Sequence, residues 1–310
     1  MRFIEASRRS IGALALAAAA LVAGCGGGDL LDPFQPERIL AFGDETSVIG
    51  ADGRNWGING LDANGAFSCT VRPNWVQALA TGFGFAFPQC NPAGFTRLAT
   101  LYAAPAAKQA DVAAQIDTHL AGGTGFGAKD LVTILAGQHD ILEVYGQFAT
   151  LGLDGAKAEL RNRGKALAAQ VNRVAQAGGR VLIVTVPDLG LSPFAIAEET
   201  ATPGRKKALA ELTDAFNSGL RADIINDGRR IGLVLADEMV QVISRNPAFN
   251  GFNNVTQVAC ATAPPACTTA TLVSGASDST WLWADATHLS YGGHNRLTTL
   301  ADTRARNNPF

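Results

Sequence analysis

Short apolar runs alternate with helical patterns along most of the chain. Each run is continuously apolar, which is typical of strands buried on both faces of a parallel sheet. The predicted strands are residues 38–43, 131–136, 181–186 and 232–236. The predicted helices are residues 106–120, 153–177, 205–227, 237–244 and 291–305, and residues 248–280 are predicted to form a long loop. This order predicts an α/β fold of three layers, α/β/α, around a central parallel sheet.

The composition excludes several classes of protein. Of the 310 residues, 47% are hydrophobic and 17% are charged, which is too apolar for a disordered chain. The net charge is -2, so the chain lacks the basic excess of a nucleic-acid-binding protein. The glycine-rich residues 122–127 precede a predicted strand instead of opening a helix, so they do not fit a dinucleotide-binding loop, and we expect no cofactor.

The first residues have the pattern of a targeting signal. Three arginines, Arg2, Arg8 and Arg9, precede an apolar run over residues 11–23. This run has 13 residues, whereas a membrane-spanning helix needs about 20. We therefore expect a secretory signal over residues 1–24.

Residues 21–25, Leu-Val-Ala-Gly-Cys, resemble the lipobox of bacterial lipoproteins. In those proteins cleavage occurs before the cysteine, which then carries the lipid. The resemblance implies a lipid on Cys25, a tether over residues 25–37, and a protein anchored in the bacterial cell envelope, with the outer membrane as the expected membrane. The alternative is an ordinary secretory peptide with a chance cysteine.

Four cysteines remain when Cys25 is set aside. An even number of cysteines in an oxidising compartment predicts disulfides, and four cysteines permit three connectivities. The pairs Cys69–Cys90 and Cys260–Cys267 are favoured because each closes a short, loop-like segment. The rival interpretation, a zinc site, is disfavoured because neither pair has the spacing of typical zinc ligands.

Four segments, in order, resemble the sequence blocks of the SGNH hydrolases, also called the GDSL family. Residues 39–44 resemble the strand and turn of the first block, and residues 135–140 resemble the third block. Residues 285–288 match the last block, and residues 186–193 resemble a turn of the lipase-like branch. The resemblance covers residues 38–305 and implies one SGNH-type α/β/α domain over residues 38–310.

The resemblance implies acyl-transfer chemistry without a cofactor. In this family a serine after a Gly-Asp pair attacks an ester carbonyl, a histidine takes its proton, and an aspartate orients the histidine. By position, Asp285 matches the orienting residue and His288 the base. Gly94 is matched to the block-two glycine that helps to hold the oxyanion. The expected substrate is a small-molecule ester, or an acylated glycan or lipid.

Two positions depart from the family pattern. Glu45 stands in the place of the serine, and His139 stands in the place of an asparagine that binds the oxyanion. A carboxylate is a poor nucleophile toward a simple ester, and loss of a triad serine typically costs about 10⁶ in turnover. One interpretation is an ester hydrolase with an altered nucleophile, in which Glu45 acts as a base on water or Ser47 supplies the hydroxyl.

Three other interpretations remain open at this point. The chain can be a pseudoenzyme that binds a ligand in the retained cleft without turnover. Alternatively, Glu45, His139, Asp285 and His288 form a metal site, since two imidazoles and two carboxylates suit zinc or another divalent ion. A third possibility is a binding or scaffold lipoprotein, with tryptophans such as Trp56 marking a partner surface.

Overall fold

The computed structural model describes residues 34–307. The predicted signal, Cys25 and most of the predicted tether lie outside the described residues. Between residues 34 and 307, no helix is both long and apolar enough to cross a membrane.

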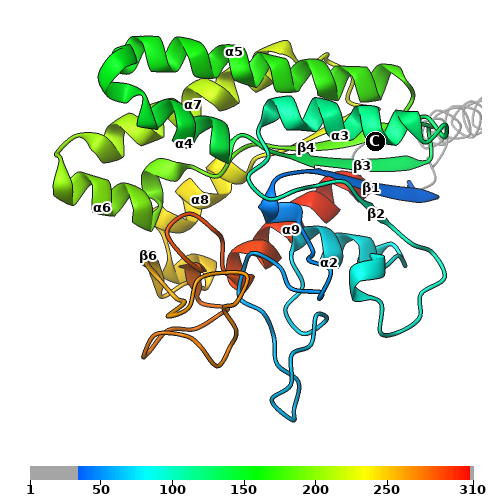
Figure 1. Cartoon of the computed structure of the whole chain (residues 1–310), viewed down its shortest axis with the longest axis horizontal. Helices are drawn as coiled ribbons and strands as arrows, with labels where there is room; N and C mark the ends of the chain where they lie inside the picture. The colour runs from blue at the N-terminus through cyan, green and yellow to red at the C-terminus, as the bar shows by residue number, and fades with distance from the viewer. Residues whose placement is uncertain (1–33, 308–310) are drawn as a thin grey trace, which may run out of the picture. The chain divides into compact units, whose positions relative to one another are not determined.

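A five-stranded parallel sheet forms the centre of the domain (Figure 1). Its strands are β1 (Arg38–Gly43), β2 (Thr100–Leu101), β3 (Asp130–Leu135), β4 (Arg180–Val184) and β5 (Ile231–Val234). Their order across the sheet is β2-β1-β3-β4-β5, and every neighbouring pair is parallel. Because parallel strands end at one edge, the residues that follow β1 and β3 lie close together.

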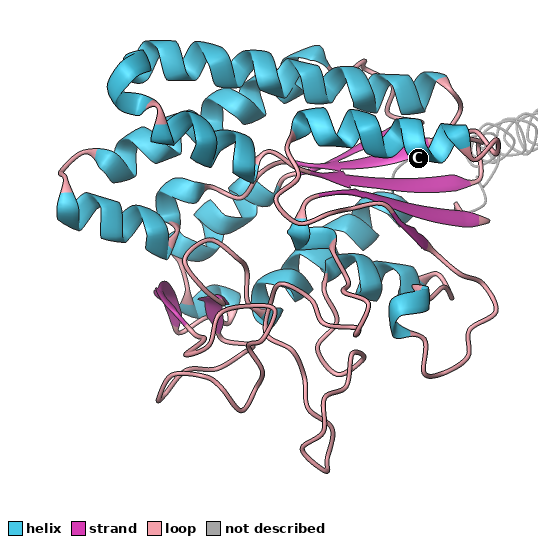
Figure 2. Cartoon of the chain, in the orientation of Figure 1, coloured by secondary structure: helices cyan, strands magenta, loops and turns pink. Residues whose placement is uncertain are grey.

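Helices cover both faces of this sheet (Figure 2). One face carries α3 (Gln109–Ala121), α4 (Gln138–Gly146), α5 (Phe148–Gln176) and α7 (Arg205–Asp223). The other face carries α2 (Trp75–Gly82), α8 (Ala236–Arg245) and α9 (Tyr291–Asn307). Successive β1 side chains divide between the two layers, since Leu40 and Phe42 pack with the first group of helices and Ile39 and Ala41 with the second. The predicted three-layer α/β fold is confirmed.

The predicted strands and long helices are confirmed, with their ends shifted by a few residues. The prediction of a structureless loop over residues 248–280 was wrong in part. This segment contains β6 (Asn254–Val258), which pairs in parallel with β7 (Trp281–Trp283). β6 is half exposed and mostly polar, so it lacks the apolar run that identifies the central strands. The helix α6 (Pro193–Ala201) was also not predicted.

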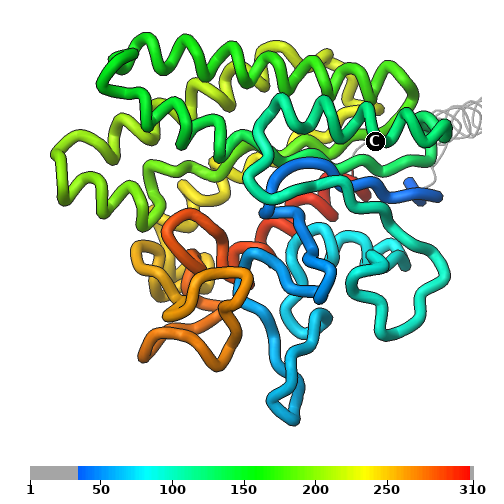
Figure 3. The backbone as a smooth tube through the Cα atoms, viewed as in Figure 1, coloured from blue at the N-terminus to red at the C-terminus, as the bar shows by residue number. Residues whose placement is uncertain are grey.

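The connection that precedes α2 and the connection between α8 and α9 are both long. They lie on the same side of the sheet as α2 and α9, as the backbone trace in Figure 3 shows. They contact each other directly, since the amide of Asn59 donates to the Cys267 carbonyl at 3.0 Å and Arg72 pairs with Asp278. The predicted disulfides Cys69–Cys90 and Cys260–Cys267 are both present. Covalent links and polar contacts therefore hold this region, where regular secondary structure is sparse.

Candidate active site

Glu45 lies in a tight turn at the end of β1. Gly43 has a φ of +128°, and a Cβ at this position would lie 1.9 Å from the carbonyl oxygen of Leu135. Only glycine therefore lets β1 approach the end of β3 this closely. Asp44 then caps the short 3-10 helix Glu45–Ser47, because its Oδ1 accepts from the amide of Thr46 at 3.0 Å. This turn fixes the backbone that carries the Glu45 side chain.

The Glu45 carboxylate is the meeting point of three elements. Its Oε1 lies 2.5 Å from Nε2 of His139, the second residue of α4. The same oxygen lies 3.0 Å from Nε2 of His288, in the turn before α9. Its Oε2 accepts from the backbone amide of Ala106 at 2.8 Å, in the loop before α3. The structure thus brings together Glu45, His139 and His288, which the sequence had singled out from separate segments.

Asp285 holds His288 within a compact turn. Oδ2 of Asp285 lies 2.8 Å from Nδ1 of His288. Oδ1 of Asp285 accepts from the amides of Thr287 and His288 at 2.9 and 2.8 Å. The order Asp285–His288–Glu45 is that of an Asp-His-Ser triad with a carboxylate in place of the hydroxyl.

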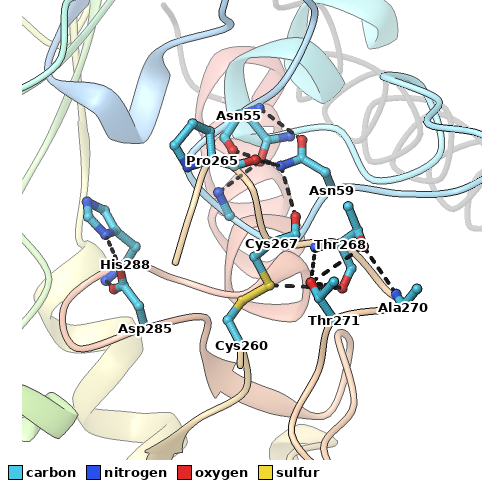
Figure 4. The surroundings of a disulfide bond; sticks show 11 residues. Asn55, Asn59, Cys260, Pro265, Cys267, Thr268, Ala270, Thr271, Asp285 and His288 are labelled. Atoms are coloured by element: carbon cyan, nitrogen blue, oxygen red, sulfur yellow. Dashed lines mark hydrogen bonds and ion pairs between the residues drawn. A yellow bond between two sulfur atoms is a disulfide. The ribbon is translucent and has the colours of Figure 1, made fainter. Parts of the chain in front are cut away.

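The loop closed by the Cys260–Cys267 disulfide stabilises this turn. Figure 4 shows the Asp285–His288 pair and the disulfide-bonded loop in one view. The amide of Cys260 donates to the carbonyl of Ala284 at 2.9 Å, and Ala284 directly precedes Asp285. The disulfide-bonded loop therefore fixes the backbone from which the Asp285 side chain starts.

Exposure across the cluster is uneven. Glu45 is only 3% exposed, whereas the side chains of His288 and His139 are 15% and 25% exposed. The carboxylate is therefore the most buried member of the cluster, and the two imidazoles and Asp285 are its more exposed members.

The electrostatics of the cluster favour ionised partners. Burial alone would raise the pKa of Glu45, but the hydrogen bonds from His139 and then His288 hold it well below its usual range. The hydrogen bond to Glu45 raises the pKa of His139. Burial alone would lower the pKa of His288, but its hydrogen bonds to Asp285 and Glu45 raise it to about 10. At neutral pH His288 is thus an imidazolium ion between the Glu45 and Asp285 carboxylates, and the bond to Glu45 favours the charged form of His139 as well.

Asp44 differs from these carboxylates. It is fully buried, and its Oδ2 has no hydrogen-bond partner among the described residues. Burial, followed by the charge of Glu45, raises the pKa of Asp44 to about 7. Near neutral pH, Asp44 therefore exchanges a proton beside a Glu45 that stays ionised.

Gly94 does not join the cluster. It is exposed, and its amide donates to the carbonyl of Asn91, in the loop after the short 3-10 helix Pro88–Cys90. The amide that reaches Glu45 belongs to Ala106, which follows β2 and has a φ of +61°. The match to the family's block-two glycine predicts Gly94 for this role, whereas an alanine with a positive φ gives no sequence signal.

Ser47 is buried behind the turn. Its Oγ accepts a hydrogen bond from the indole nitrogen of Trp75 at 3.2 Å, and its amide donates to the Asp44 carbonyl at 3.0 Å. Trp75 is a fully buried core residue. These contacts give Ser47 a packing role and leave no support for Ser47 as the nucleophile.

The structure does not support the alternative of a metal site. Within residues 34–307, no group of three or more His, Cys, Asp or Glu side chains could hold a metal ion. The physical reason is that Nε2 of His139 and Nε2 of His288 both point at one oxygen of Glu45. The four side chains bond to one another and leave no shared point for an ion.

Two further residues were not singled out from the sequence for this role. Gln115 on α3 binds both the amide and the carbonyl of Gly43, at 2.8 and 2.9 Å. Asp140 accepts from the amide of Gln109 at 2.9 Å and thereby joins the start of α3 to α4. Together they fix the loop that carries Ala106 against the turn that carries Glu45.

No family model and no curated protein matches the chain. Solved structures do match it, 42 chains in all. One is a member of the lipolytic protein G-D-S-L family from Veillonella parvula, with 12% identity, a TM-score of 0.41, and coverage of 85% of this chain and 95% of that chain. A second is the lipase Lip_vut3 from a goat rumen metagenome, with 11% identity, a TM-score of 0.49, and coverage of 84% and 94%. A third is a variant of the acetyl xylan esterase Axe2 from Geobacillus stearothermophilus, with 14% identity, a TM-score of 0.43, and coverage of 88% and 95%. Over most of its length, this chain is similar in fold to these solved structures.

Proposed function

We propose that this chain hydrolyses ester bonds, as a GDSL/SGNH-type hydrolase in which Glu45 replaces the serine. The observation that carries this proposal is the Asp285–His288–Glu45 line, with hydrogen-bond distances of 2.8 and 3.0 Å along it. The Ala106 amide and the His139 imidazole converge on the same carboxylate. These two donors are suited to the negative charge that develops on an ester carbonyl during acyl transfer.

The substrate class that fits this proposal is a small-molecule acyl ester. No cofactor is needed for such a reaction, because the acid, the base and the oxyanion donors are all side chains or backbone groups of the cluster.

The test is hydrolysis of p-nitrophenyl acetate by the mature chain and two variants. We expect His288→Ala to lower kcat/KM by about 10²-fold or more, because the proton-transfer group is lost. Ser47→Ala is the matched control and is expected to keep the activity, since Ser47 bonds to Trp75 and not to the cluster. Equal rates for the wild-type chain and His288→Ala would contradict the proposal.

A second candidate function is ligand binding without turnover. It is favoured by one observation, which is that both oxygens of Glu45 already accept hydrogen bonds from the groups an oxyanion would need. An inert wild-type chain, together with a Glu45→Ser variant that gains hydrolysis, would decide for this second function.

We further propose that Cys25 carries a lipid that anchors the protein in the bacterial cell envelope. The support is the lipobox resemblance of residues 21–25 and the presence of two disulfides, which persist in oxidising compartments. In cells fed a labelled fatty acid, the full chain should take up label and sediment with membranes. Cys25→Ser should do neither, and a labelled Cys25→Ser variant would contradict the anchor.

A further inference from the structure

The state of the proton between Glu45 and His288 sets this site apart from a serine triad. A serine hydroxyl must give its proton to the histidine before its oxygen can attack. Here the oxygen 3.0 Å from His288 Nε2 is a carboxylate oxygen, and Asp285 binds the other ring nitrogen at 2.8 Å. These two bonds raise the pKa of His288 to about 10, so its imidazole carries a proton at neutral pH. The resting site therefore has an ionised oxygen and a charged acid next to each other.

We infer that Glu45 is a covalent nucleophile that takes an acyl group from thioesters and aryl esters, so that the site acts on activated acyl donors and not on alkyl or sugar esters. This inference rests on the proposed function and names its substrate class. Its geometric basis is the Glu45 carboxylate, which faces the acid His288 on one side and the oxyanion donors His139 and Ala106 on the others.

The choice of substrate follows from how a tetrahedral intermediate breaks down. The intermediate tends to expel its weaker base, and the Glu45 carboxylate is a weaker base than a thiolate, a phenolate or an alkoxide. Forward breakdown therefore needs the His288 proton on the leaving atom, and the difference in basicity that this proton must offset is far larger for an alkoxide than for a thiolate or a phenolate. Alkyl and sugar esters therefore return to the starting ester. Thiols and phenols have pKa values of about 8.5 and 10, far below the 15.7 of water. With the proton of His288 Nε2 directed to the leaving atom, these groups depart and the acyl group stays on Glu45.

The two half-reactions balance. In the first, a Glu45 oxygen forms a bond to the acyl carbon, the bond from that carbon to sulfur or aryl oxygen breaks, and the leaving group takes the proton from His288 Nε2. This leaves a mixed anhydride on Glu45 and a neutral His288. In the second, His288 takes a proton from water, the hydroxide adds to the acyl carbon, and the bond to Glu45 breaks. The free acid leaves, and the Glu45 anion and the His288 cation are restored.

His139 has a defined part in this sequence. Its side chain is 25% exposed, more than that of His288 or Glu45, and it bonds to the Glu45 oxygen at 2.5 Å. As Glu45 attacks, negative charge moves from the carboxylate to the substrate carbonyl oxygen. The His139 proton then follows the charge and binds the oxyanion, together with the amide of Ala106.

Two measurements test this inference on the mature chain. The first compares acetyl-N-acetylcysteamine, phenyl acetate and ethyl acetate, and we expect turnover of the first two and no turnover of ethyl acetate. The second adds hydroxylamine during reaction with phenyl acetate, followed by mass spectrometry of the peptide that contains Glu45. We expect a hydroxamate on Glu45, which forms only from an activated carboxyl group.

The variants Glu45→Gln and Glu238→Gln form a matched pair. Glu45→Gln keeps the shape of the side chain but removes the nucleophile, so both turnover and hydroxamate should be lost. Glu238 lies on α8 with a 60% exposed side chain, and Glu238→Gln should behave as the wild-type chain. Hydrolysis of ethyl acetate at a similar rate, or His288-dependent hydrolysis with no label on Glu45, overturns this inference while leaving ester hydrolysis in place. Absence of both hydrolysis and label overturns both proposals.

Discussion

Nε2 of His288 lies 3.0 Å from Oε1 of Glu45, across 243 residues of sequence. Asp285 binds the opposite nitrogen of the same ring at 2.8 Å, so the imidazole is held between two carboxylates. A histidine between two anions keeps its proton, because both neighbours stabilise the charged form. In this site His288 is therefore an acid in the resting state, whereas the histidine of a serine triad is a base.

A serine in place of Glu45 should return the histidine to its usual role. Glu45→Ser removes one of the two anions beside His288 and places a hydroxyl near its Nε2. We expect kcat/KM for p-nitrophenyl acetate to rise by on the order of 10²–10³-fold, since a triad serine typically contributes about 10⁶ and part of this is lost to imperfect placement. The double variant Glu45→Ser with His288→Ala should lose this gain. No gain in a folded Glu45→Ser variant would show that the rest of the triad is out of position.

The stability of the domain should fall as the pH rises above neutral. The pKa of His288 is raised from 6.5 to about 10, so its contribution is full below pH 6.5 and is lost as the pH rises through about 10. Asp44 acts in the same direction but over a lower range, since its pKa is raised from 3.8 to about 7 and its contribution is lost between these two values. Thermal unfolding followed by circular dichroism should give a Tm that falls between about pH 6.5 and pH 10. Glu45→Gln should flatten this fall, and Glu238→Gln should not.

The two disulfides should differ in their effect on stability and activity. Their sequence separations are 21 residues for Cys69–Cys90 and 7 residues for Cys260–Cys267. The larger loop loses more unfolded-state entropy, so its removal by paired Cys→Ala changes should cost about 3 kcal/mol, against about 2 kcal/mol for the smaller loop. Only the loss of Cys260–Cys267 should also lower kcat, because Cys260 bonds to the residue before Asp285. Denaturant titration and steady-state rates measure the two effects, and an equal loss of kcat in both variants would contradict this assignment.

The glycine at the end of β1 should not tolerate a side chain. Gly43→Ala would bring a Cβ within 1.9 Å of backbone atoms at a φ of +128°, so the end of β1 must move. We expect a loss of about 3 kcal/mol or more in the free energy of unfolding, with loss of activity. Gly146→Ala, at the end of α4, is the control, because a Cβ there meets nothing within 4 Å. Urea titration of both variants would contradict the argument if their midpoints were alike.

The sequence predicted the parts of the site that depend on local pattern. The apolar run of β1 and the following Asp44 and Glu45 located one edge of the site, and the three-residue spacing of Asp285 and His288 located another. Helix and strand periods are local signals, and the core strands follow them closely. The sheet then brings these separate segments together because parallel strands end at one edge.

The part of the site that the sequence did not predict depends on contacts between residues that are far apart in the sequence. The Ala106 amide reaches Glu45 across 61 residues, and its direction depends on one positive φ at an alanine. An alanine gives no sign of that conformation, and the match to the family's block-two glycine predicts Gly94 instead. In the same way, the sequence supplied suitable metal ligands in Glu45 and His139, but only their mutual hydrogen bond shows that they satisfy each other.

The pairing of two imidazoles with two carboxylates has a consequence for how molecules arrive. When both imidazoles are protonated, the four charges sum to zero over a few ångströms, so their combined field decays much faster than that of a single charge. In that state the site neither attracts nor repels charged molecules from a distance, and encounter rates should depend little on ionic strength. Selection among acyl compounds of different charge then depends on contacts made close to His139 and His288.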